Sequence, residues 1–317
     1  MAELSETRVS TEVDGLPLSL SNLDKPLFPS GFTKGELIAY YVEIADVILP
    51  HLADRAITRV RFPNGTGEAS FYEKNVPAGA PEWVETKQVA TSSEPITYVT
   101  ASRRADLVWL ANLKAVELHT PQWRFSEATD NGDGYVLEGP GEPLATTLVV
   151  DLDPGPGITP ADSARGAIIA ATTLAEAGLE AFAKSSGNKG LQLSVPIAPT
   201  PASEVFAFAQ SLAKHLARSH PKLFVATMSK DARTGLIFVD FAQNYAARNT
   251  ITAYSVRGLD SPSVATPLTW EEVAALTADT PVRVSPSEML ERVQTHGDLW
   301  ADQLPTPASP PLPEPFA

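Results

Sequence analysis

Residues 148–157, LVVDLDPGPG, carry two carboxylates at a spacing that could do chemistry. The apolar run 148–150 predicts a buried strand that ends at a Pro/Gly turn just after Asp151 and Asp153. Because side chains on a strand alternate between faces, the two carboxylates should share a face, where they repel each other unless a cation lies between them. The pair indicates a site for a hard cation such as Mg²⁺ or Mn²⁺, although Asp-x-Asp also occurs at ordinary strand ends.

Two further segments could belong to the same site. A second apolar run, residues 236–239, ends in Asp240, which gives a third acidic strand end. The turn at residues 185–190, SSGNKG, combines small residues with Lys189 and fits either an anion cradle or a plain hairpin turn. It lacks the spacing of a Walker A loop. Together these features indicate a two-metal site that acts on a phosphate ester or anhydride.

Composition limits the class of protein. The chain has 317 residues, of which 43% are hydrophobic and 20% charged, as in ordinary globular proteins. It has no Cys, which excludes disulfides and zinc-thiolate sites. The net charge of −14 argues against nonspecific nucleic-acid binding by overall charge but allows a local basic groove. With no signal-peptide pattern and no long apolar run, we expect a cytoplasmic protein without membrane contact.

The elements that must position these residues alternate between helices and strands. The predicted helices are residues 34–49 ending near Pro50, the first part of 106–119, a helix from Thr159-Pro160 to Gly178, one from Thr200-Pro201 to about Ser219, and short helices from Thr269 and Ser285. The predicted strands are a hairpin in 55–75, one strand in 84–105, two in 181–197 and one in 250–257. Residues 1–17 should be loose, and residues 301–317 should form a Pro-rich tail, disordered or extended.

Aromatic and imidazole side chains stand near these elements. Phe71 and Tyr72 are adjacent on the predicted hairpin, so they point to opposite faces and one of them should be exposed. Exposed rings near basic residues suit base stacking, although ordinary edge-strand packing is the better explanation of these two residues taken alone. Taken alone, His119 is expected to be a buried core histidine whose ring nitrogens are hydrogen-bonded within the protein.

Seven blocks occur in one order along the chain: LSNLDKPLFP, ASFYEK, LVWLANLKAVELHTPQW, LVVDLDPGPG, SSGNKGLQL, FVDFAQN and TITAYSVRG. Together they resemble the polymerase domain of bacterial ligase D, a member of the archaeo-eukaryotic primase superfamily used in non-homologous end joining. The resemblance covers residues 18–300. It implies an α+β fold of two packed α/β subdomains that share one cleft, with a catalytic sheet of the RNA-recognition-like primase-polymerase type.

The resemblance also implies roles for individual residues. The positions that match the family's metal-binding and catalytic triad are Asp151, Asp153 and Asp240. The positions that match nucleotide contacts are His119, Ser186, Lys189, Gln192 and Arg257. The positions that match the pocket for a downstream 5′-phosphate are Asn22, Lys25 and Lys34. Phe71 and Tyr72 match the family's aromatic pair that stacks against the template. Lys230 and Arg233 lie in the block that corresponds to a mobile loop shaping the family's active site.

Position 192 departs from the family's pattern. The motif of the family reads Ser-Gly-x-Lys-Gly-x-His, and this chain has Gln192 at the last place. An amide can donate a hydrogen bond to a phosphate oxygen but cannot carry a proton charge. We therefore expect weaker triphosphate binding than in the family, with catalysis retained because the three carboxylates are present.

The function implied is a DNA repair primase-polymerase, acting alone or as a fragment of a longer protein. It would add nucleotides, preferentially ribonucleotides, to a primer 3′-hydroxyl at gaps or broken ends with a 5′-phosphate, using two Mn²⁺ or Mg²⁺ ions and NTP or dNTP. A separate DNA ligase and an end-binding protein would be partners near the bacterial nucleoid. One alternative is a DNA-end-binding or synapsis module with reduced catalysis. Another is a nucleotide-sugar glycosyltransferase, which the other six blocks do not support.

Overall fold

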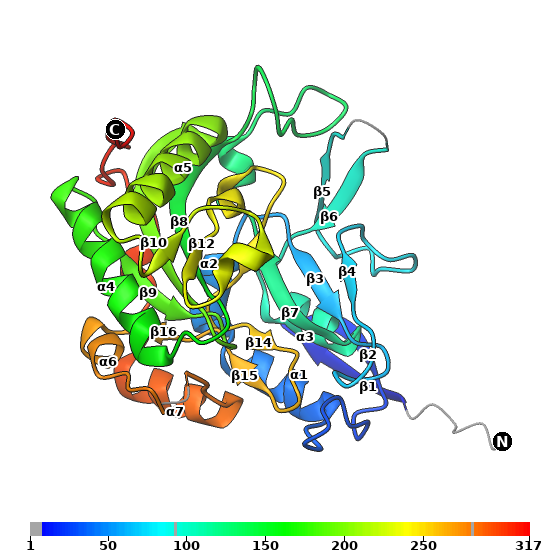
Figure 1. The fold of residues 1–317 in the computed structure, drawn as a ribbon. Helices are drawn as coiled ribbons and strands as arrows, with labels where there is room; N and C mark the ends of the chain where they lie inside the picture. Colours follow the sequence, from blue (N-terminus) through cyan, green and yellow to red (C-terminus); the bar gives the residue numbers. More distant parts are fainter. Residues whose placement is uncertain (1–7, 92–93, 280–281) are drawn as a thin grey trace.

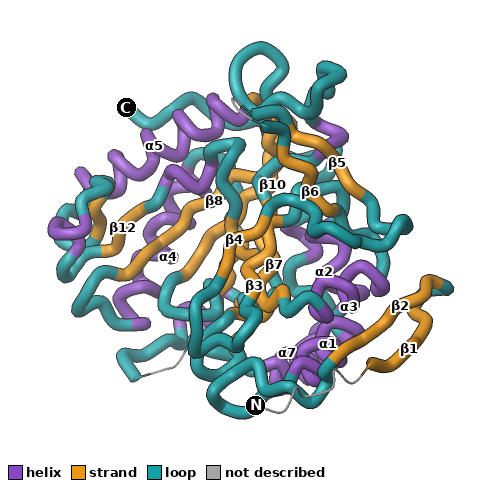
Figure 2. Tube along the Cα trace, turned by 90° about the vertical axis from the view of Figure 1, so that its right-hand side faces the viewer, coloured by secondary structure: helices purple, strands orange, loops and turns teal. Residues whose placement is uncertain are grey.

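Two sheets, each with its own apolar core, form the centre of the molecule (Figures 1 and 2). The computed structural model describes residues 8–91, 94–279 and 282–317. Helices and both parallel and antiparallel strand pairs occur in the same chain, so the predicted α+β class is confirmed. Within the described residues, no helix is long and apolar enough to cross a membrane.

The larger sheet has six strands in the order β11-β12-β8-β10-β9-β16. Its strands are β8 (Leu144–Pro154), β9 (Phe182–Ser185), β10 (Leu191–Pro201), β11 (Phe224–Val225), β12 (Ile237–Val239) and β16 (Pro267–Leu268). Helices α4 (Pro160–Glu176) and α5 (Ala202–Ser219) pack on one face of this sheet, where Leu148, Val150 and Leu152 of β8 point into the core. Alternation along β8 therefore turns Asp151 and Asp153 to the opposite face.

The smaller sheet has four antiparallel strands in the order β13-β7-β3-β4. These are β3 (Thr58–Arg61), β4 (Phe71–Glu73), β7 (Ala115–Thr120) and β13 (Thr250–Ile251). Its core is completed by α1 (Lys34–Glu43), α2 (Ala45–Leu52), α3 (Arg104–Asn112) and α7 (Pro286–His296). Figure 2 shows β3, β4 and β7 beside β8 and β10, so residues of both sheets can face one space.

Short elements complete the fold. Three two-stranded pairs are β1 (Arg8–Val13) with β2 (Leu16–Ser21), β5 (Thr86–Val89) with β6 (Ile96–Val99), and β14 (Val256–Arg257) with β15 (Ser263–Val264). In the part of the chain that the structure describes, the remaining helices are α6 (Trp270–Ala274) and the 3-10 turns η1 (Phe125–Glu127), η2 (Lys230–Arg233), η3 (Phe241–Asn244) and η4 (Ala301–Gln303).

The predicted helix starts at Thr159, Thr269 and Ser285 are confirmed, and each of these residues closes a capping box. The single helix predicted for 34–49 is wrong, because the chain breaks at Ile44 into α1 and α2. Pro50 lies inside α2, where it removes one backbone hydrogen bond. The complete burial of Ile44, Ala45 and Ile48 outweighs that loss.

The strand predictions need three corrections. Residues 8–17 are not loose, because Asp14 and Gly15 take positive φ and close a two-residue hairpin between β1 and β2. Residues 1–7 lie outside the described part of the chain. Residues 84–105 hold two paired strands, not one. Residues 250–257 form β13 and β14 in different sheets, because Tyr254 takes a φ of 68° and turns the chain between them.

The Pro-rich C-terminal segment, residues 304–317, forms no helix or strand after η4 but packs on the core of the larger sheet. Leu312 and Phe316 pack against the core of the larger sheet, and the Phe316 ring centroid lies 5.5 Å from that of Phe208. The Ala198 N–H donates to the Pro310 carbonyl at 2.8 Å, which ties the segment to β10. The segment is therefore part of the folded molecule.

Candidate active site

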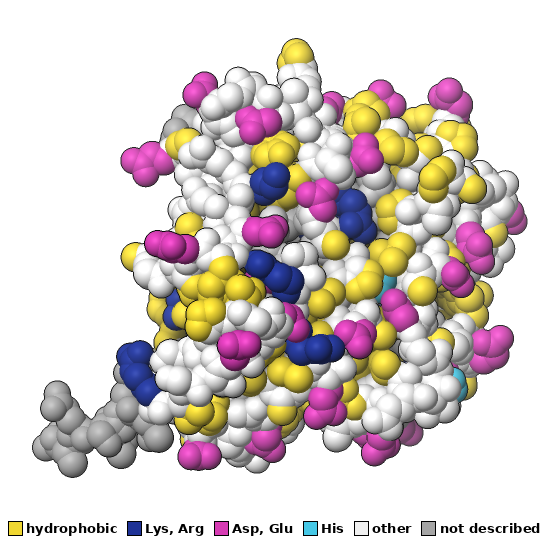
Figure 3. Space-filling view, turned by 180° about the vertical axis from the view of Figure 1, so that it is seen from behind, with side chains coloured by type: hydrophobic (Ala, Val, Ile, Leu, Met, Phe, Trp, Pro, Cys, Tyr) yellow, Lys and Arg dark blue, Asp and Glu magenta, His cyan; other side chains and the backbone are white. Residues whose placement is uncertain are grey.

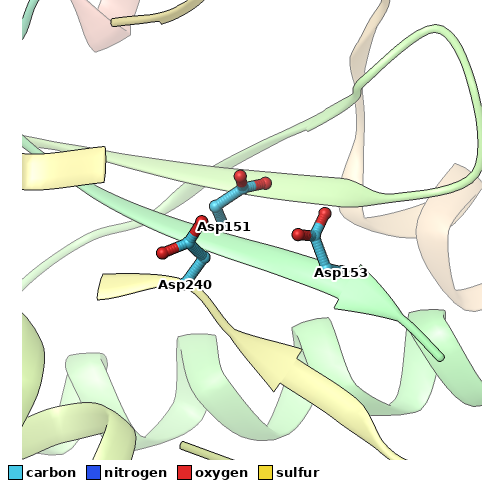
Figure 4. A group of neighbouring side chains, drawn as sticks. All are labelled: Asp151, Asp153 and Asp240. Carbon is cyan, nitrogen blue, oxygen red and sulfur yellow. The ribbon is translucent and has the colours of Figure 1, made fainter. Parts of the chain in front are cut away.

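Three carboxylates meet where β8 and β12 end (Figure 4). Asp151 and Asp153 lie on one face of β8, as predicted, and Asp240 follows β12, which pairs antiparallel with β8. The Asp240 N–H donates to the Asp151 carbonyl at 2.9 Å and fixes this register. Each side chain offers one oxygen, and the three oxygens lie within 4.8 Å of one another.

Burial and mutual repulsion disfavour the charged forms of Asp151 and Asp153. Burial, with repulsion from Asp153, raises the pKa of Asp151 to about 7, because only 7% of Asp151 is exposed. Burial and repulsion from Asp240 likewise raise the pKa of Asp153. A cation bound between the three groups would relieve this repulsion. An all-carboxylate donor set fits a hard, oxygen-preferring ion such as Mg²⁺ or Mn²⁺.

A cavity of about 650 Å³ lies in front of the Asp pair. Besides Asp151 and Asp153, the sequence-predicted residues that line it are Tyr72, His119, Ser186, Lys189, Gln192, Arg233 and Arg257. Both sheets contribute, so residues that are distant in sequence converge on one space. Lining residues that the sequence reasoning missed are Lys74, Asn188, Gln243, Arg248 and Asn249. The recognised blocks were the available signal: Lys74, Asn188 and Gln243 lie within ASFYEK, SSGNKGLQL and FVDFAQN, and Asn249 directly precedes TITAYSVRG.

His119 on β7 is buried, and it is oriented by a residue that was not predicted. Its Nε2 lies 2.8 Å from Oε2 of Glu117, whose other oxygen accepts from the Gly258 N–H at 2.9 Å. That oxygen also lies 3.5 Å from Nε of Arg257. Burial lowers the pKa of His119, so the imidazole is neutral near pH 7. Because Glu117 and His119 are two residues apart on a strand, alternation was the signal for this pair.

The SSGNKG segment forms the turn between β9 and β10, as predicted. The Ser186 hydroxyl accepts from the N–H groups of Asn188 at 3.4 Å and Gly190 at 3.2 Å. Lys189 is exposed at the mouth of the cavity. The turn therefore presents a hydroxyl and an ammonium beside the carboxylates.

Gln192 is directly opposite Asp151 in the β8–β10 register, and its amide joins two buried groups. Its Nε2 donates to Oδ1 of Asp151 at 3.0 Å, and its Oε1 accepts from Nζ of Lys184. The Lys184 ammonium also donates to the Ile251 carbonyl at 2.9 Å, and burial lowers its pKa to about 7. Both ends of the Gln192 amide are therefore engaged by protein groups. Sequence reasoning missed Lys184, which lies in the four-residue strand β9.

The residues predicted to grip a 5′-phosphate lie together between β2 and α1. The Lys25 N–H donates to the Asn22 carbonyl at 3.1 Å, and the Lys34 N–H donates to the Lys25 carbonyl at 2.9 Å. Lys34 is 1% exposed, and its ammonium donates to the backbone carbonyl and the hydroxyl of Ser21. Lys25 is held differently, because its Nζ donates to the Pro63 carbonyl at 3.0 Å.

Of the remaining predicted DNA contacts, Tyr72 and Arg233 line the cavity. Phe71 and Tyr72 are 58% and 67% exposed, so the expectation that only one would be exposed is wrong. The reason is that β4 is a three-residue edge strand. The Tyr72 ring centroid lies 6.0 Å from that of His119, which places Tyr72 at the cavity. Lys230 opens η2 and Arg233 closes it, with the Arg233 guanidinium 3.7 Å from the Phe238 ring centroid.

Gly155 lies where the end of β8 passes close to the backbone that leads into β12, and Gly155→Ala is expected to be destabilising. An added Cβ would lie 1.8 Å from the Arg233 carbonyl oxygen and 2.8 Å from that of Leu236, so the backbone must shift. We expect a loss of about 1–3 kcal/mol in unfolding free energy, together with weaker Mn²⁺ binding. Denaturant unfolding and Mn²⁺ titration measure the two effects. Gly67→Ala, with a Cβ 3.5 Å from the Pro29 side chain, is the control, and equal stability of the two variants would contradict the prediction.

Comparisons with known proteins agree with this geometry. The family model "LigD, primase-polymerase domain" matches residues 33–300. A multifunctional non-homologous end joining protein LigD of Mycolicibacterium smegmatis is 41% identical over 285 residues, which are 89% of this chain and 35% of that protein. The multifunctional LigD of Mycobacterium tuberculosis is 39% identical over 303 residues, 94% of this chain and 37% of that protein. This chain thus spans about a third of the length of these curated relatives.

A solved structure is similar over nearly all of its own length. The polymerase domain from Mycobacterium tuberculosis ligase D, in complex with DNA, superposes with a TM-score of 0.82 at 38% sequence identity. The match covers 92% of this chain and 99% of that one. The matched segment contains the three carboxylates and every cavity-lining residue described above. The chain therefore belongs to the LigD primase-polymerase domain family.

Proposed function

We propose that this chain is a DNA repair nucleotidyltransferase that adds nucleotides to a primer 3′-hydroxyl at gaps or broken ends bearing a 5′-phosphate. The observation that carries the proposal is the triad of Asp151, Asp153 and Asp240 beside a cavity with cationic walls. The relatives are named for non-homologous end joining, and the similar solved structure is a polymerase domain in complex with DNA. The proposed activity combines end joining, for which the relatives are named, with nucleotide addition on DNA by a polymerase domain.

The three carboxylates would hold two Mn²⁺ or Mg²⁺ ions. Bound there, the ions would activate the attacking hydroxyl and stabilise the leaving pyrophosphate. The Ser186 hydroxyl and the cationic Lys189 and Arg257 would bind the triphosphate. His119, kept neutral by burial and oriented by Glu117, would contact the nucleotide beside Asp151. The Gln192 amide would orient the Asp151 carboxylate by donating a hydrogen bond to it.

DNA would be bound by local groups near this site and not by attraction to the overall charge of the chain. On the face opposite that of Figure 1, acidic side chains are spread among a few basic ones (Figure 3), in keeping with the net charge of −14. Phe71 and Tyr72 offer exposed rings for stacking against the template. Lys25, with Asn22 beside it, would bind the 5′-phosphate of the downstream strand.

Primer extension on a gapped duplex tests the proposal. Wild type with Mn²⁺ or Mg²⁺ should add nucleotides, faster with NTP than with dNTP, and more efficiently with a 5′-phosphate than with a 5′-hydroxyl in the gap. Lys25→Ala should remove most of the 5′-phosphate preference while leaving extension on the 5′-hydroxyl substrate unchanged. Failure of wild type to extend any primer with either metal would overturn the proposed activity.

A second function is favoured by one observation. Gln192 stands where the family pattern has His, and both ends of its amide are occupied within the protein. A chain with reduced catalysis could still bind and align DNA ends. Binding that depends on the 5′-phosphate without measurable extension in the same assay would support this end-binding function over the polymerase.

A further inference from the structure

A second, much smaller cavity lies between the two sheets, beside the catalytic cavity. It is lined by residues of β7 and β13 from the smaller sheet and of β8, β9 and β10 from the larger one (Figure 2). Its volume is about 40 Å³, which is room for about three water-sized molecules and too little for a nucleotide. Gln192, Thr250 and Ile251 line both cavities, so the small cavity adjoins the active site. The described residues that line it include basic, amide and hydroxyl side chains but no Asp or Glu.

Arg55 brings to this wall a charge that no lining carboxylate balances. Only 5% of Arg55 is exposed, and its Nη1 donates to the Pro121 carbonyl at 2.5 Å, whereas its buried Nε has no hydrogen-bond partner. Burial, followed by repulsion from Arg124, lowers the pKa of Arg55 to about 9, and the attraction of Asp54 is weaker than either effect. The guanidinium is therefore charged at neutral pH, where a buried charge without a partner is costly.

Lys184 adds a second cationic group from the larger sheet. Its ammonium donates to the Gln192 side chain and to the Ile251 carbonyl, which uses two of its three protons. The Thr250 hydroxyl accepts from the Gln122 amide at 3.0 Å, so it keeps its own proton to donate. The wall thus offers both charged and neutral donors to an acceptor inside the cavity.

His51 also lines the cavity but supplies no positive charge to it. Its Nε2 lies 3.0 Å from Oδ2 of Asp298, and burial lowers the pKa of His51, so the ring is neutral near pH 7. When Nε2 donates to Asp298, the unpartnered Nδ1 is an acceptor, which suits a water molecule and not an anion. The positive charge of the wall therefore comes from Arg55 and Lys184.

We propose that this cavity binds one small monovalent inorganic anion, of the size of chloride, between the Arg55 guanidinium and the Lys184 ammonium. The anion would offset the cost of burying these cations, which water alone would not neutralise. Arg55 is bonded to the segment that follows β7, and Lys184 lies on β9, so the anion would join the two sheets. The site is separate from the catalytic cavity and does not depend on the proposed function.

Thermal unfolding at constant ionic strength tests the site. Sodium chloride replaces sodium gluconate, whose organic anion is too large for the cavity, and a chelator keeps the carboxylate triad free of metal. The unfolding midpoint of wild type should rise by about 3 °C at about 0.2 M chloride and then level off, because the anion binds only the folded chain. Arg55→Met, which removes the guanidinium, should show no such rise.

Arg59→Met is the matched control. Arg59 is as deeply buried as Arg55, but it is paired with Glu73 at 3.0 Å and does not line this cavity. The midpoint of the control should therefore rise with chloride as in wild type. Equal midpoints of wild type in the two salts, or an equal rise in Arg55→Met, would overturn the anion site.

Bromide-soaked crystals of wild type give a second measurement, which does not require Arg55→Met to fold. Anomalous scattering should place one bromide ion in the cavity, within hydrogen-bond distance of the Arg55 side chain. A cavity that holds only water in that map would overturn the proposal. Neither experiment measures nucleotide addition, so failure of the anion site and failure of the polymerase activity remain distinguishable.

Discussion

Asp151→Asn is expected to make the metal-free protein more stable above pH 7 while lowering nucleotide addition by about 10²-fold or more. Burial and the neighbouring Asp153 raise the pKa of Asp151 to about 7 in the folded chain, whereas an unfolded Asp titrates at about 3.9. The folded state therefore favours the protonated form. The stabilisation that this protonated carboxyl gives the folded state is complete below about pH 4 and is lost as the pH rises through 7. The loss in unfolding free energy is about 2–4 kcal/mol.

Because Asn does not ionise, the variant avoids this loss. The difference in unfolding free energy between Asp151→Asn and wild type should be small at pH 4, grow between pH 4 and 7, and stay constant above that. Thermal unfolding in the presence of a chelator at several pH values measures it. Asp162→Asn is the control of opposite sign, because the hydrogen bonds from Thr159 lower the pKa of Asp162 and its removal should destabilise the protein at neutral pH.

Bound metal should reverse the order of stability of wild type and Asp151→Asn. Saturating Mn²⁺ stabilises a protein that binds it in the folded state, so wild type should gain stability and Asp151→Asn should gain much less. Primer extension by the variant should fall by about 10²-fold or more, because several kcal/mol of transition-state stabilisation is lost with the ions. A variant that is less stable than wild type in chelator at pH 8 would contradict the assignment of Asp151 as a strained metal ligand.

The shared face of Asp151 and Asp153 was predictable because strand alternation is a local rule. Their proximity to Asp240 depends on the pairing of β8 with β12, which local patterns do not specify. Here the ordered blocks and their resemblance to a known family supplied the missing long-range information. The capped helices were equally predictable, because a capping box is complete within four residues.

The parts that were missed depend on tertiary contacts or on single dihedral angles. Lys184 shows no pattern of its own, and its importance comes from Gln192 on the neighbouring strand and from Ile251 on the other sheet. The split of 250–257 depends on the positive φ of Tyr254, a conformation that few non-glycine residues take. Both features arise where the two sheets meet, which no single segment of sequence encodes.

Gln192→Leu is expected to weaken both the fold and the metal site, because the Gln192 amide is the bridge between Lys184 and Asp151. Leu takes one hydrogen-bond acceptor from the buried Lys184 ammonium, which keeps its bond to the Ile251 carbonyl, and it also removes the donor that orients Asp151. We expect a loss of about 2–4 kcal/mol in unfolding free energy. Mn²⁺ affinity, measured without nucleotide or DNA, should fall about tenfold or more.

Gln192→His should instead be nearly neutral, although it restores the residue of the family pattern. A neutral imidazole has one donor for Asp151 and one acceptor for Lys184, so it can replace both amide contacts. An imidazolium would have two donors and would face the Lys184 ammonium, so protonation is disfavoured and a gain in extension at pH 6 is not expected. A clear gain at pH 6 would show that position 192 acts on the triphosphate and not through Lys184.

A double-mutant cycle with Lys184→Met separates the two roles of Gln192. If Gln192 stabilises the fold through Lys184, then Gln192→Leu should cost much less stability in the Lys184→Met background than in wild type. Its effect on Mn²⁺ affinity should persist in that background, because the hydrogen bond to Asp151 is lost in either case. Additive stability losses would mean that the two side chains act independently, and the bridge would then have no energetic role.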